Sequence, residues 1–326
     1  FGLFFLAPFV GEFLLGNLTL ADPWLGLLLA PLYGSGALLV RELGRRGGGG
    51  WPSMALLAAA YALIEEGPVD QLLWNDSYAG EDLLSGDSFI PAIGMSVELT
   101  QTILALHTIW SICVPIAIVE TFVTHRRTDP WLGRVGLTVV GVVYALGAGL
   151  VFWGNYYEER FLASPGQLAG IGIIIVALVV AAYLIKGRRL PRLSGSAPSP
   201  WIVGATALVL TSAWWGPAVL VMAGWYEWIG VAVWVLAVTA GVGLVSRWSR
   251  QAGWDDRHRL ALAGGAMLTY VWASFPVPPE GGGSAMVDLV SNIVFGAVAL
   301  IILALAARRT LDRTMIGSGT THQARS

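Results

Sequence analysis

The sequence contains one cysteine, Cys113, and one lysine, Lys186, among 326 residues. A single cysteine can form neither an intramolecular disulfide nor a cysteine-based metal site. Charged residues are also scarce, at 12% of the chain against roughly 25% in an average soluble domain. Hydrophobic residues make up 56%. This composition predicts a chain that lies mostly in a lipid bilayer, where backbone groups need internal partners and long apolar runs form helices.

Several common sequence motifs are missing as well. The chain has no G-x-S-x-G, no H-E-x-x-H and no dinucleotide-binding glycine fingerprint. Its net charge of −2 and the confinement of its cations to short clusters argue against nucleic acid as a partner. Arginine strongly outnumbers lysine, and glycine and alanine are abundant, as is typical of a GC-rich bacterial genome. The expected location is therefore the plasma (inner) membrane of such a bacterium.

Apolar segments recur along the chain, each close to or longer than the ~20 residues that cross a ~30 Å bilayer. The sequence therefore predicts an all-α fold, a polytopic transmembrane helical bundle of about ten spans. Residues 201–246 are long enough for two helices, and dividing them preserves the charge alternation described below. The predicted spans are 3–20, 24–41, 51–73, 91–123, 132–153, 166–186, 201–223, 225–246, 258–275 and 285–307.

Basic residues gather in every second loop between these spans. Because Lys and Arg near span ends stay on the cytoplasmic side, the alternation predicts an even number of spans with both termini in the cytoplasm. The remaining loops carry acids, with Arg160 as their only cation, and form the predicted outer face. The basic clusters contain Arg41, Arg45, Arg46, Arg126, Arg127, Arg134, Lys186, Arg188, Arg189, Arg192, Arg247, Arg250, Arg257, Arg259, Arg308, Arg309 and Arg313.

The chain is predicted to form one transmembrane domain, residues 1–313, followed by a disordered cytoplasmic tail at 314–326. The first apolar run lacks a basic flank and a small-residue cleavage site, so it is interpreted as a span rather than a signal peptide. His125, His258 and His322 fall in predicted cytoplasmic loops or in the tail, where they are expected to be solvated.

Three carboxylates stand close together at the end of the third predicted span. Glu65, Glu66 and Asp70 lie within six residues, and counting ~1.5 Å per residue places Glu65 roughly 21 Å into the membrane. Pro68 lacks an N–H and is expected to kink the helix. An ionisable group inside a span costs about 2.5–3.5 kcal/mol, which makes these residues candidates for proton binding, acid–base catalysis or cation binding. The alternative is a helix end whose acids reach water.

Further polar residues interrupt other predicted spans. His107, in the fourth span, is suited to proton transfer or metal ligation. Glu98 lies near the outer end of the same span, and Glu12 lies in the first. Asp288 and Asn292 share one face at the start of the tenth span. Under the predicted topology these side chains fall in the outer half of the membrane, which predicts an acidic cavity that opens outward. The alternative is a set of unrelated interfacial acids.

The Glu65-Glu66 pair, followed in the next span by Ile103-x-x-x-His107, resembles the first two motifs of the CPBP family. This family contains the type II CAAX prenyl endopeptidases and bacteriocin-immunity-type membrane proteins. The resemblance implies an intramembrane hydrolase in which Glu65 acts as the base. It also implies that Glu66 and His107 bind water or a divalent metal such as Zn.

Three differences separate the chain from the family pattern. Asp70 stands where the first motif of the family continues to an arginine. The third motif, a histidine and an asparagine four residues apart, is not found, and Asp288-x-x-x-Asn292 is its nearest stand-in. In addition, the reaction centre of the family tends toward the cytoplasmic side, whereas these acids are predicted near the outer face.

Three functions therefore remain open. The first is a CPBP-like intramembrane (metallo)hydrolase, or a degenerate relative without activity, with the glutamate pair and His107 at its site. The second is a secondary transporter coupled to H⁺ or another cation, in which Gly11-Glu12 or Gly67-Pro68 marks a broken helix near the midplane. The third is a non-catalytic membrane partner or sensor. The lipid bilayer is the one partner that the sequence predicts.

Overall fold

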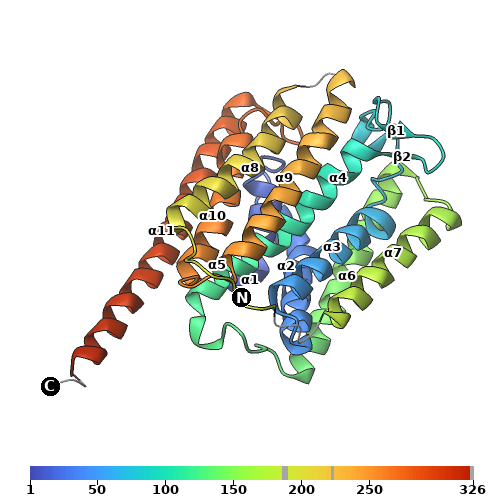
Figure 1. The fold of residues 1–326 in the computed structure, drawn as a ribbon. Helices are drawn as coiled ribbons and strands as arrows, with labels where there is room; N and C mark the ends of the chain where they lie inside the picture. Colours follow the sequence, from blue (N-terminus) through green and yellow to red (C-terminus); the bar gives the residue numbers. More distant parts are fainter. Residues whose placement is uncertain (186–189, 222–223, 324–326) are drawn as a thin grey trace.

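The structure, a computed structural model, describes residues 1–185, 190–221 and 224–323, without the side chains of residues 79 and 312–323. Long helices run side by side in a bundle, and a short hairpin lies at one end (Figure 1). The helices are α1 (Gly2–Pro8), α2 (Leu25–Gly47), α3 (Gly50–Ile64), α4 (Val97–Ala105), α5 (Val114–Phe122), α6 (Arg134–Glu159), α7 (Pro165–Leu184), α8 (Pro200–Leu220), α9 (Glu227–Trp248), α10 (Asp256–Ala273) and α11 (Ala285–Gln323).

Three wide π-helical turns extend or join these helices: η1 (Phe9–Phe13), η2 (Glu65–Val69) and η4 (Leu106–Cys113). Three short 3-10 turns lie in the connections: η3 (Tyr78–Gly80), η5 (Thr124–Arg126) and η6 (Gly224–Tyr226). The hairpin pairs β1 (Phe89–Ile90) with β2 (Met95–Ser96) in antiparallel register, Phe89 opposite Ser96. Since α4, η4 and α5 follow one another without a break, they form one continuous rod.

Six helical stretches of the described chain are long and apolar enough to cross a membrane. They are 97–122, 134–159, 165–184, 200–220, 224–248 and 285–311, and residues 2–13 form a shorter apolar helix. The predicted multi-pass helical membrane fold is therefore confirmed, including the division of 201–246 between α8 and α9. The number of spans and the side of the membrane on which the termini lie stay predictions.

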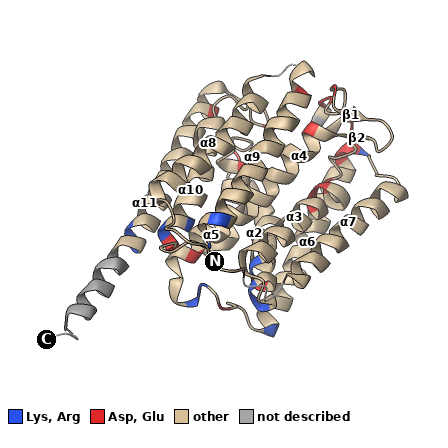
Figure 2. Ribbon diagram, in the orientation of Figure 1, with Lys and Arg blue, Asp and Glu red and all other residues tan. Residues whose placement is uncertain are grey.

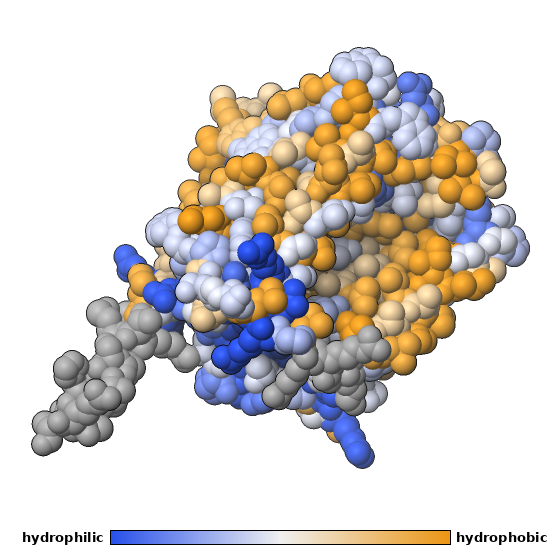
Figure 3. Space-filling view, in the orientation of Figure 1, coloured by the Kyte–Doolittle hydropathy of each residue, from blue (hydrophilic) through white to orange (hydrophobic). Residues whose placement is uncertain are grey.

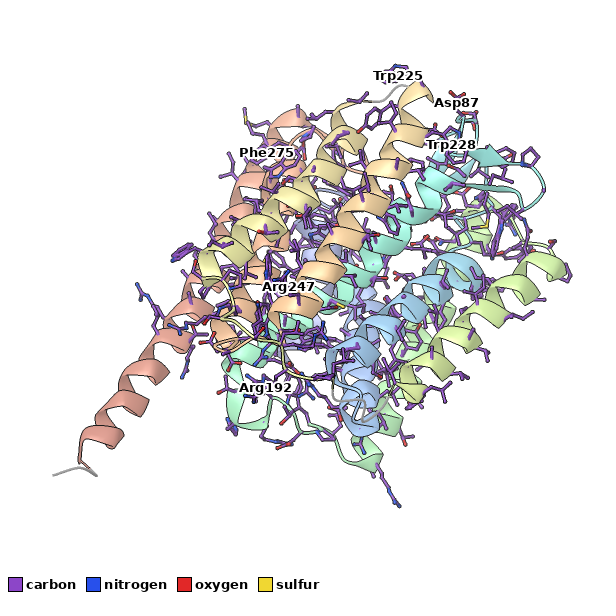
Figure 4. All side chains as sticks on the ribbon, viewed as in Figure 1. Asp87, Arg192, Trp225, Trp228, Arg247 and Phe275 are labelled. Atoms are coloured by element: carbon purple, nitrogen blue, oxygen red, sulfur yellow. The ribbon has the colours of Figure 1, made fainter. Side chains whose placement is uncertain are left out.

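The two ends of the bundle differ in charge (Figure 2). Arginines gather at the end where α2 finishes and α10 begins, whereas acids occupy the opposite end and parts of the interior. Arg192 and Arg247 mark the basic end in Figure 4, and Asp87, Trp225 and Trp228 mark the other. Hydrophobic side chains cover most of the face between the two ends in Figure 3. This distribution is what a bilayer-embedded bundle requires.

The centre of the bundle is packed around the rod formed by α4, η4 and α5. Trp110 stacks on Tyr270 of α10 with ring centroids 4.6 Å apart, and Trp214 and Trp215 of α8 surround the pair. The indole N–H of Trp110 donates to the carbonyl of Ala266 at 2.8 Å. This rod therefore joins the C-terminal helices to α2 and α3, which pack on its other side.

Some predicted boundaries are wrong. The first helix ends at Phe13 rather than near residue 20, because Gly16 adopts a left-handed φ of 99° that an α-helix does not allow. The fourth begins at Val97, after the hairpin, where Ser96 caps it by accepting from the N–H of Leu99. His258 is buried rather than solvated. The basic residues in 186–189 lie outside the described residues, and the predicted disorder of the tail stays a prediction.

Candidate functional site

Each of the three π-helical turns carries an ionisable residue that the sequence marks as a candidate. Glu12 lies in η1, Glu65 and Glu66 lie in η2, and His107 lies in η4. The wide turns are closed by bonds five residues apart, such as the N–H of Asp70 donating to the carbonyl of Glu65 at 2.6 Å. Such turns are rare and are frequent at functional sites.

Proline explains why the helices widen at these places. Pro8 directly precedes η1, Pro68 lies inside η2, and Pro115 follows η4 by two residues. A proline has no N–H to donate to the carbonyl four residues earlier, and its ring clashes with that carbonyl. One extra residue in the turn relieves this conflict. The sequence thereby deforms three helices at positions that carry carboxylate or imidazole side chains.

The glutamate pair and the imidazole meet in the interior of the bundle. The Nδ1 atom of His107 lies 3.0 Å from Oε2 of Glu65, and its Nε2 atom lies 2.6 Å from Oε1 of Glu66. The Oγ atom of Ser111 lies 3.3 Å from Nδ1. All three ionisable residues are at most 5% exposed. The glutamate pair and the imidazole are therefore in contact, as they must be if they form a single site.

This geometry limits where protons can lie in the group. A neutral imidazole has one N–H donor and one acceptor. With a neutral ring, Nε2–H can donate to Glu66 and Nδ1 can accept from the Ser111 hydroxyl, which leaves the Glu65 oxygen facing Nδ1 with no proton between them. A further proton on the ring would allow both nitrogens to donate to the two carboxylates.

Glu12 adds a third carboxylate beside this group. Its Oε1 atom accepts a short hydrogen bond from the Tyr33 hydroxyl, and its Oε2 atom accepts from Nδ2 of Asn17 at 3.0 Å. The Tyr33 ring lies 5.7 Å from the His107 ring, centroid to centroid. A Cβ atom at Gly11 would lie 2.8 Å from Oγ of Ser111, so glycine allows η1 to pack directly on η4. We call Glu12, Tyr33, Glu65, Glu66 and His107 the His107 site.

No ion pair among the described residues joins the three glutamates of this site to an arginine or lysine. One imidazolium can balance only one carboxylate, and burial of a further charge is costly. The His107 site therefore buries more carboxyl groups than it has described cations to pair with them. The Oε2 atoms of Glu65 and Glu66 are both buried and make no hydrogen bond to a described residue.

A divalent metal does not fit the observed arrangement. The two carboxylates touch opposite nitrogens of the ring, so one ion cannot lie between all three side chains, and a ligand nitrogen must be free of a proton. In the part of the chain that the structure describes, no three His, Cys, Asp or Glu side chains form a metal-binding group. This geometry therefore does not support the zinc site that the CPBP resemblance implies.

Of the supporting residues named from the sequence, Glu12 belongs to the His107 site, whereas the side chains of the others make no hydrogen bond or ion pair to its members in the part of the chain that the structure describes. Asp70, one turn beyond Glu66, accepts from the Tyr78 hydroxyl at 2.9 Å and also from Nδ2 of Asn155. Glu98 accepts from the Thr102 hydroxyl at 3.0 Å on its own helix. Asp70 therefore adds a carboxylate between Glu66 and the acidic end of the bundle. Glu98 lies on a different helix and has a separate hydrogen-bond partner.

The Asp288 and Asn292 pair does not replace the missing third motif. Nδ2 of Asn292 donates to Oδ1 of Asp288 at 3.0 Å and to the carbonyl of Ser274 at 3.2 Å. The preceding residue, Ser291, accepts from the N–H of Leu20 at 2.9 Å. This face of α11 therefore supports the irregular chain after α1 rather than the glutamate pair.

A second buried charged cluster was not foreseen from the sequence. At the basic end, Arg41 donates to Glu42 at 2.9 Å and to Glu120 at 3.1 Å, and Arg45 donates to both oxygens of Glu120. Arg41 also donates to the carbonyls of three loop residues and stacks on Trp131, 3.3 Å from its ring centre. We call Arg41, Glu42, Arg45 and Glu120 the Arg41 cluster. Its arginines were interpreted as loop markers, which gave no signal that Arg41 and Glu42 would be fully buried.

Fold and site together define a multi-pass helical membrane protein with a group of buried glutamates and one histidine in its interior. The sequence profile of an uncharacterized membrane protein family matches residues 3–315, and the chain belongs to that family. The comparison with curated proteins gave no match. The comparison with solved structures gave none either. The resemblance to the CPBP family stays a prediction.

Proposed function

We propose that this protein is a proton-coupled membrane protein of the secondary-transporter class, with the His107 site as the proton-binding centre. The observation that carries the proposal is the meeting of three interrupted helices at one group of buried carboxyl and imidazole side chains. Transporters place their coupling-ion sites near the middle of the membrane, where helices are broken. Interrupted helices cost stability, so their coincidence with the ionisable residues argues for a function.

The first helix has the form expected of a broken helix. Residues 2–13 cover only about 18 Å at ~1.5 Å per residue, well short of a ~30 Å hydrocarbon layer. The chain then continues without regular structure through Thr19 and stays largely buried. Irregular backbone inside a membrane is tolerated where protein surrounds it or where it lines a cavity. Glu12 lies one residue before this break.

The depth of the site fits proton exchange with the acidic end. His107 lies ten residues beyond the start of α4, or roughly 15 Å along a helical rod. From Glu66 the carboxylates continue one turn further to Asp70, which contacts Tyr78 in the segment outside the helices. In the other direction the hydrophobic cluster around Met54 and Ile116 separates the site from the basic end. Protons would therefore enter and leave through Asp70.

A second candidate, the CPBP-like hydrolase, is favoured by a different observation. The residues of the two matching motifs do meet, and Oε2 of Glu66 is a buried oxygen without a partner. A carboxylate in that position can orient and deprotonate a water molecule, with His107 holding the proton. In this reading Glu65 and Glu66 act without a metal, as a base and its partner.

One variant distinguishes the three functions, which are the transporter, the hydrolase, and a partner or sensor without turnover. Protein in liposomes adsorbed to a solid-supported membrane is subjected to steps of external pH, and the charge displaced is recorded. We expect transient currents that are lost in Glu66→Gln. The matched control is Glu98→Gln, which neutralises an acid of the neighbouring helix that does not contact His107.

Equal currents in Glu66→Gln and in the unmodified protein would overturn the transporter proposal. Absence of currents together with metal-independent hydrolysis of a membrane peptide, lost in Glu66→Gln, would establish the hydrolase instead. If neither activity is present and neutralising Glu65, Glu66 and His107 together leaves the cellular phenotype unchanged, the protein is a partner or sensor.

A further inference from the structure

A cavity of about 430 Å³ lies at the acidic end of the bundle, apart from the His107 site. It is open to one side and is lined by the segment between η2 and α4 and by the turn between α6 and α7, which lie next to each other in Figure 1. Its volume falls within the ~300–1,000 Å³ of typical small-molecule sites. The N–H of Ala163 donates to Oε1 of Gln71 at 2.7 Å, so the two walls are fastened to each other.

The lining of this cavity combines aromatic rings with carboxylates. Phe89 and Phe161 supply half-buried rings, Trp74 supplies a ring that is only 7% exposed, and Asp76 and Asp82 supply two exposed carboxylates. Among the described residues, the lining contains no lysine, arginine or histidine. A site with negative charge and no positive charge disfavours anions, and its aromatic walls disfavour strongly hydrated ligands.

We propose that this cavity binds an organic cation, an ammonium group that carries apolar substituents, and that this cation is the cargo of the transporter. Aromatic faces attract such cations through the ring quadrupole, with tryptophan the most favourable, and nearby carboxylates add Coulomb attraction. A bare metal ion would need several oxygen ligands at close range, and no such grouping occurs among the described residues. The cargo assignment rests on the proposed function, whereas the binding site itself does not.

The position of the cavity connects it with the proton path. Trp74, which lines the cavity, follows Asp70 by four residues in the sequence. The adjacent Asn75 donates to Glu159 at 3.2 Å. Asp70 itself is bonded to Tyr78 and Asn155 in the same region. A cation that enters here approaches the outermost carboxylate of the path. Cation and proton then compete for negative charge, as exchange of one for the other requires.

The test uses a charged ligand and its neutral isostere. Purified full-length protein, in a detergent without an ammonium headgroup, is titrated with choline and with 3,3-dimethylbutan-1-ol by calorimetry. The two molecules have nearly the same shape and differ in the charge on the central atom. We expect choline to bind at least about tenfold more tightly, because cation–π and carboxylate attraction act only on the charged form.

Variants then locate the binding. Phe89→Leu and the double variant Asp76→Asn with Asp82→Asn should each weaken choline binding about fivefold or more. The matched control is Asp22→Asn, an exposed acid at the same end that does not line the cavity. Both aspartates of the cavity are exposed, so their neutralisation leaves folding intact, which the elution profile and helical circular dichroism verify.

Equal affinity for choline and the isostere, or unchanged choline binding in the double variant, overturns this inference. The result is separable from the pH-step currents. Choline binding without currents would leave a cation site on a protein that is not proton-coupled. Currents without choline binding would leave the transporter and remove this cargo.

Discussion

The protein contains two buried charged groups whose chemistry is opposite. In the Arg41 cluster every carboxylate faces an arginine, and the Arg41 guanidinium is also bonded to backbone carbonyls. In the His107 site two glutamates contact one imidazole, a third glutamate lies nearby, and one oxygen each of Glu65 and Glu66 makes no hydrogen bond to a described residue. A saturated network holds its neighbours in one arrangement, whereas an unsaturated one can take up or release protons. The comparison separates a structural role from a functional one.

The largest effect is expected for Arg41→Met. Removing this guanidinium leaves the buried Glu42 with two backbone N–H donors and the partly exposed Arg46, and it deprives Glu120 of one partner. Breaking a buried charge network by deleting one member costs about 3–5 kcal/mol. Thermal unfolding in detergent, followed by tryptophan fluorescence, should show a large drop in Tm. The control is Arg46→Met, whose guanidinium lies 3.6 Å from Glu42 and is 32% exposed. Equal unfolding of the two variants would contradict the structural role of the Arg41 cluster.

The second effect is a loss of function without a loss of stability, in Glu66→Gln. An amide keeps the shape of the side chain and removes a charge that burial disfavours. The free energy of unfolding should therefore stay within about 1 kcal/mol of that of the unmodified protein, or rise. The pH-step currents should disappear in the same preparation. Glu120→Gln is the counterpart in the saturated cluster and should behave in reverse, with lower stability. Strong destabilisation by Glu66→Gln would remove the distinction between the two groups.

An intermediate effect is expected for Tyr33→Phe. The hydroxyl of Tyr33 is the donor to Oε1 of Glu12, and its removal leaves a buried carboxyl oxygen unpaired at a cost of about 1–3 kcal/mol. Tyr270→Phe is the matched control, because the buried Tyr270 hydroxyl makes no hydrogen bond to a described residue. Denaturant titration of both variants measures the difference. A Tyr270→Phe variant as unstable as Tyr33→Phe would contradict the stabilising role of the hydrogen bond between Tyr33 and Glu12.

The smallest effect concerns an exposed ion pair near the saturated cluster. Partial burial alone would raise the pKa of Asp255, but hydrogen bonds from His258 and Arg257 outweigh it and hold the pKa below the ordinary value. The folded state therefore gains stability from this carboxylate at pH above about 4, and the gain is lost as the pH falls through the lowered pKa. After discounting for solvent screening, Asp255→Asn should cost a few tenths of a kcal/mol at pH 7. Asparagine remains a good helix cap, which isolates the charge.

The measurement compares the Tm of Asp255→Asn and the unmodified protein at pH 7 and at pH 3. The difference between them should shrink as the pH falls. A difference that grows toward low pH would contradict the direction of the pKa shift. Asp255→Asn also gives a reference value for a surface carboxylate. The corresponding change at the buried Glu120, Glu120→Gln, should lower the free energy of unfolding by several times more.

The helices and the central members of the site could be predicted from the sequence because charge is rare in this chain. Glu65, Glu66 and His107 stand out against apolar neighbours, and only two adjacent spans had to meet for them to touch. Tyr33 could not be found in this way, since a tyrosine in an apolar run gives the same signal whether it packs or donates. Its role depends on how α2 is rotated against η1, which periodicity alone does not fix.

Other parts required tertiary information. The Arg41 cluster was hidden because the rule that places arginines at cytoplasmic ends does not say which of them are buried. The pairing of Asn292 with the carbonyl of Ser274, away from the glutamates, depends on how α11 is rotated about its axis. The break after Phe13 had only Gly16 and Asn17 as local signals, and a long apolar run outweighed them.

That break has a consequence for biosynthesis. The irregular chain after α1 is completed by residues made much later: Gly16 packs on Ser274, the N–H of Leu20 donates to Ser291, and Phe13 meets Phe295 with ring centroids 5.3 Å apart. While the ribosome is still synthesising the helices between them, these backbone groups have no partners and remain costly in lipid. The segment around Gly16 is therefore expected to settle only after α10 and α11 have inserted, so that an early part of the chain waits for a late one.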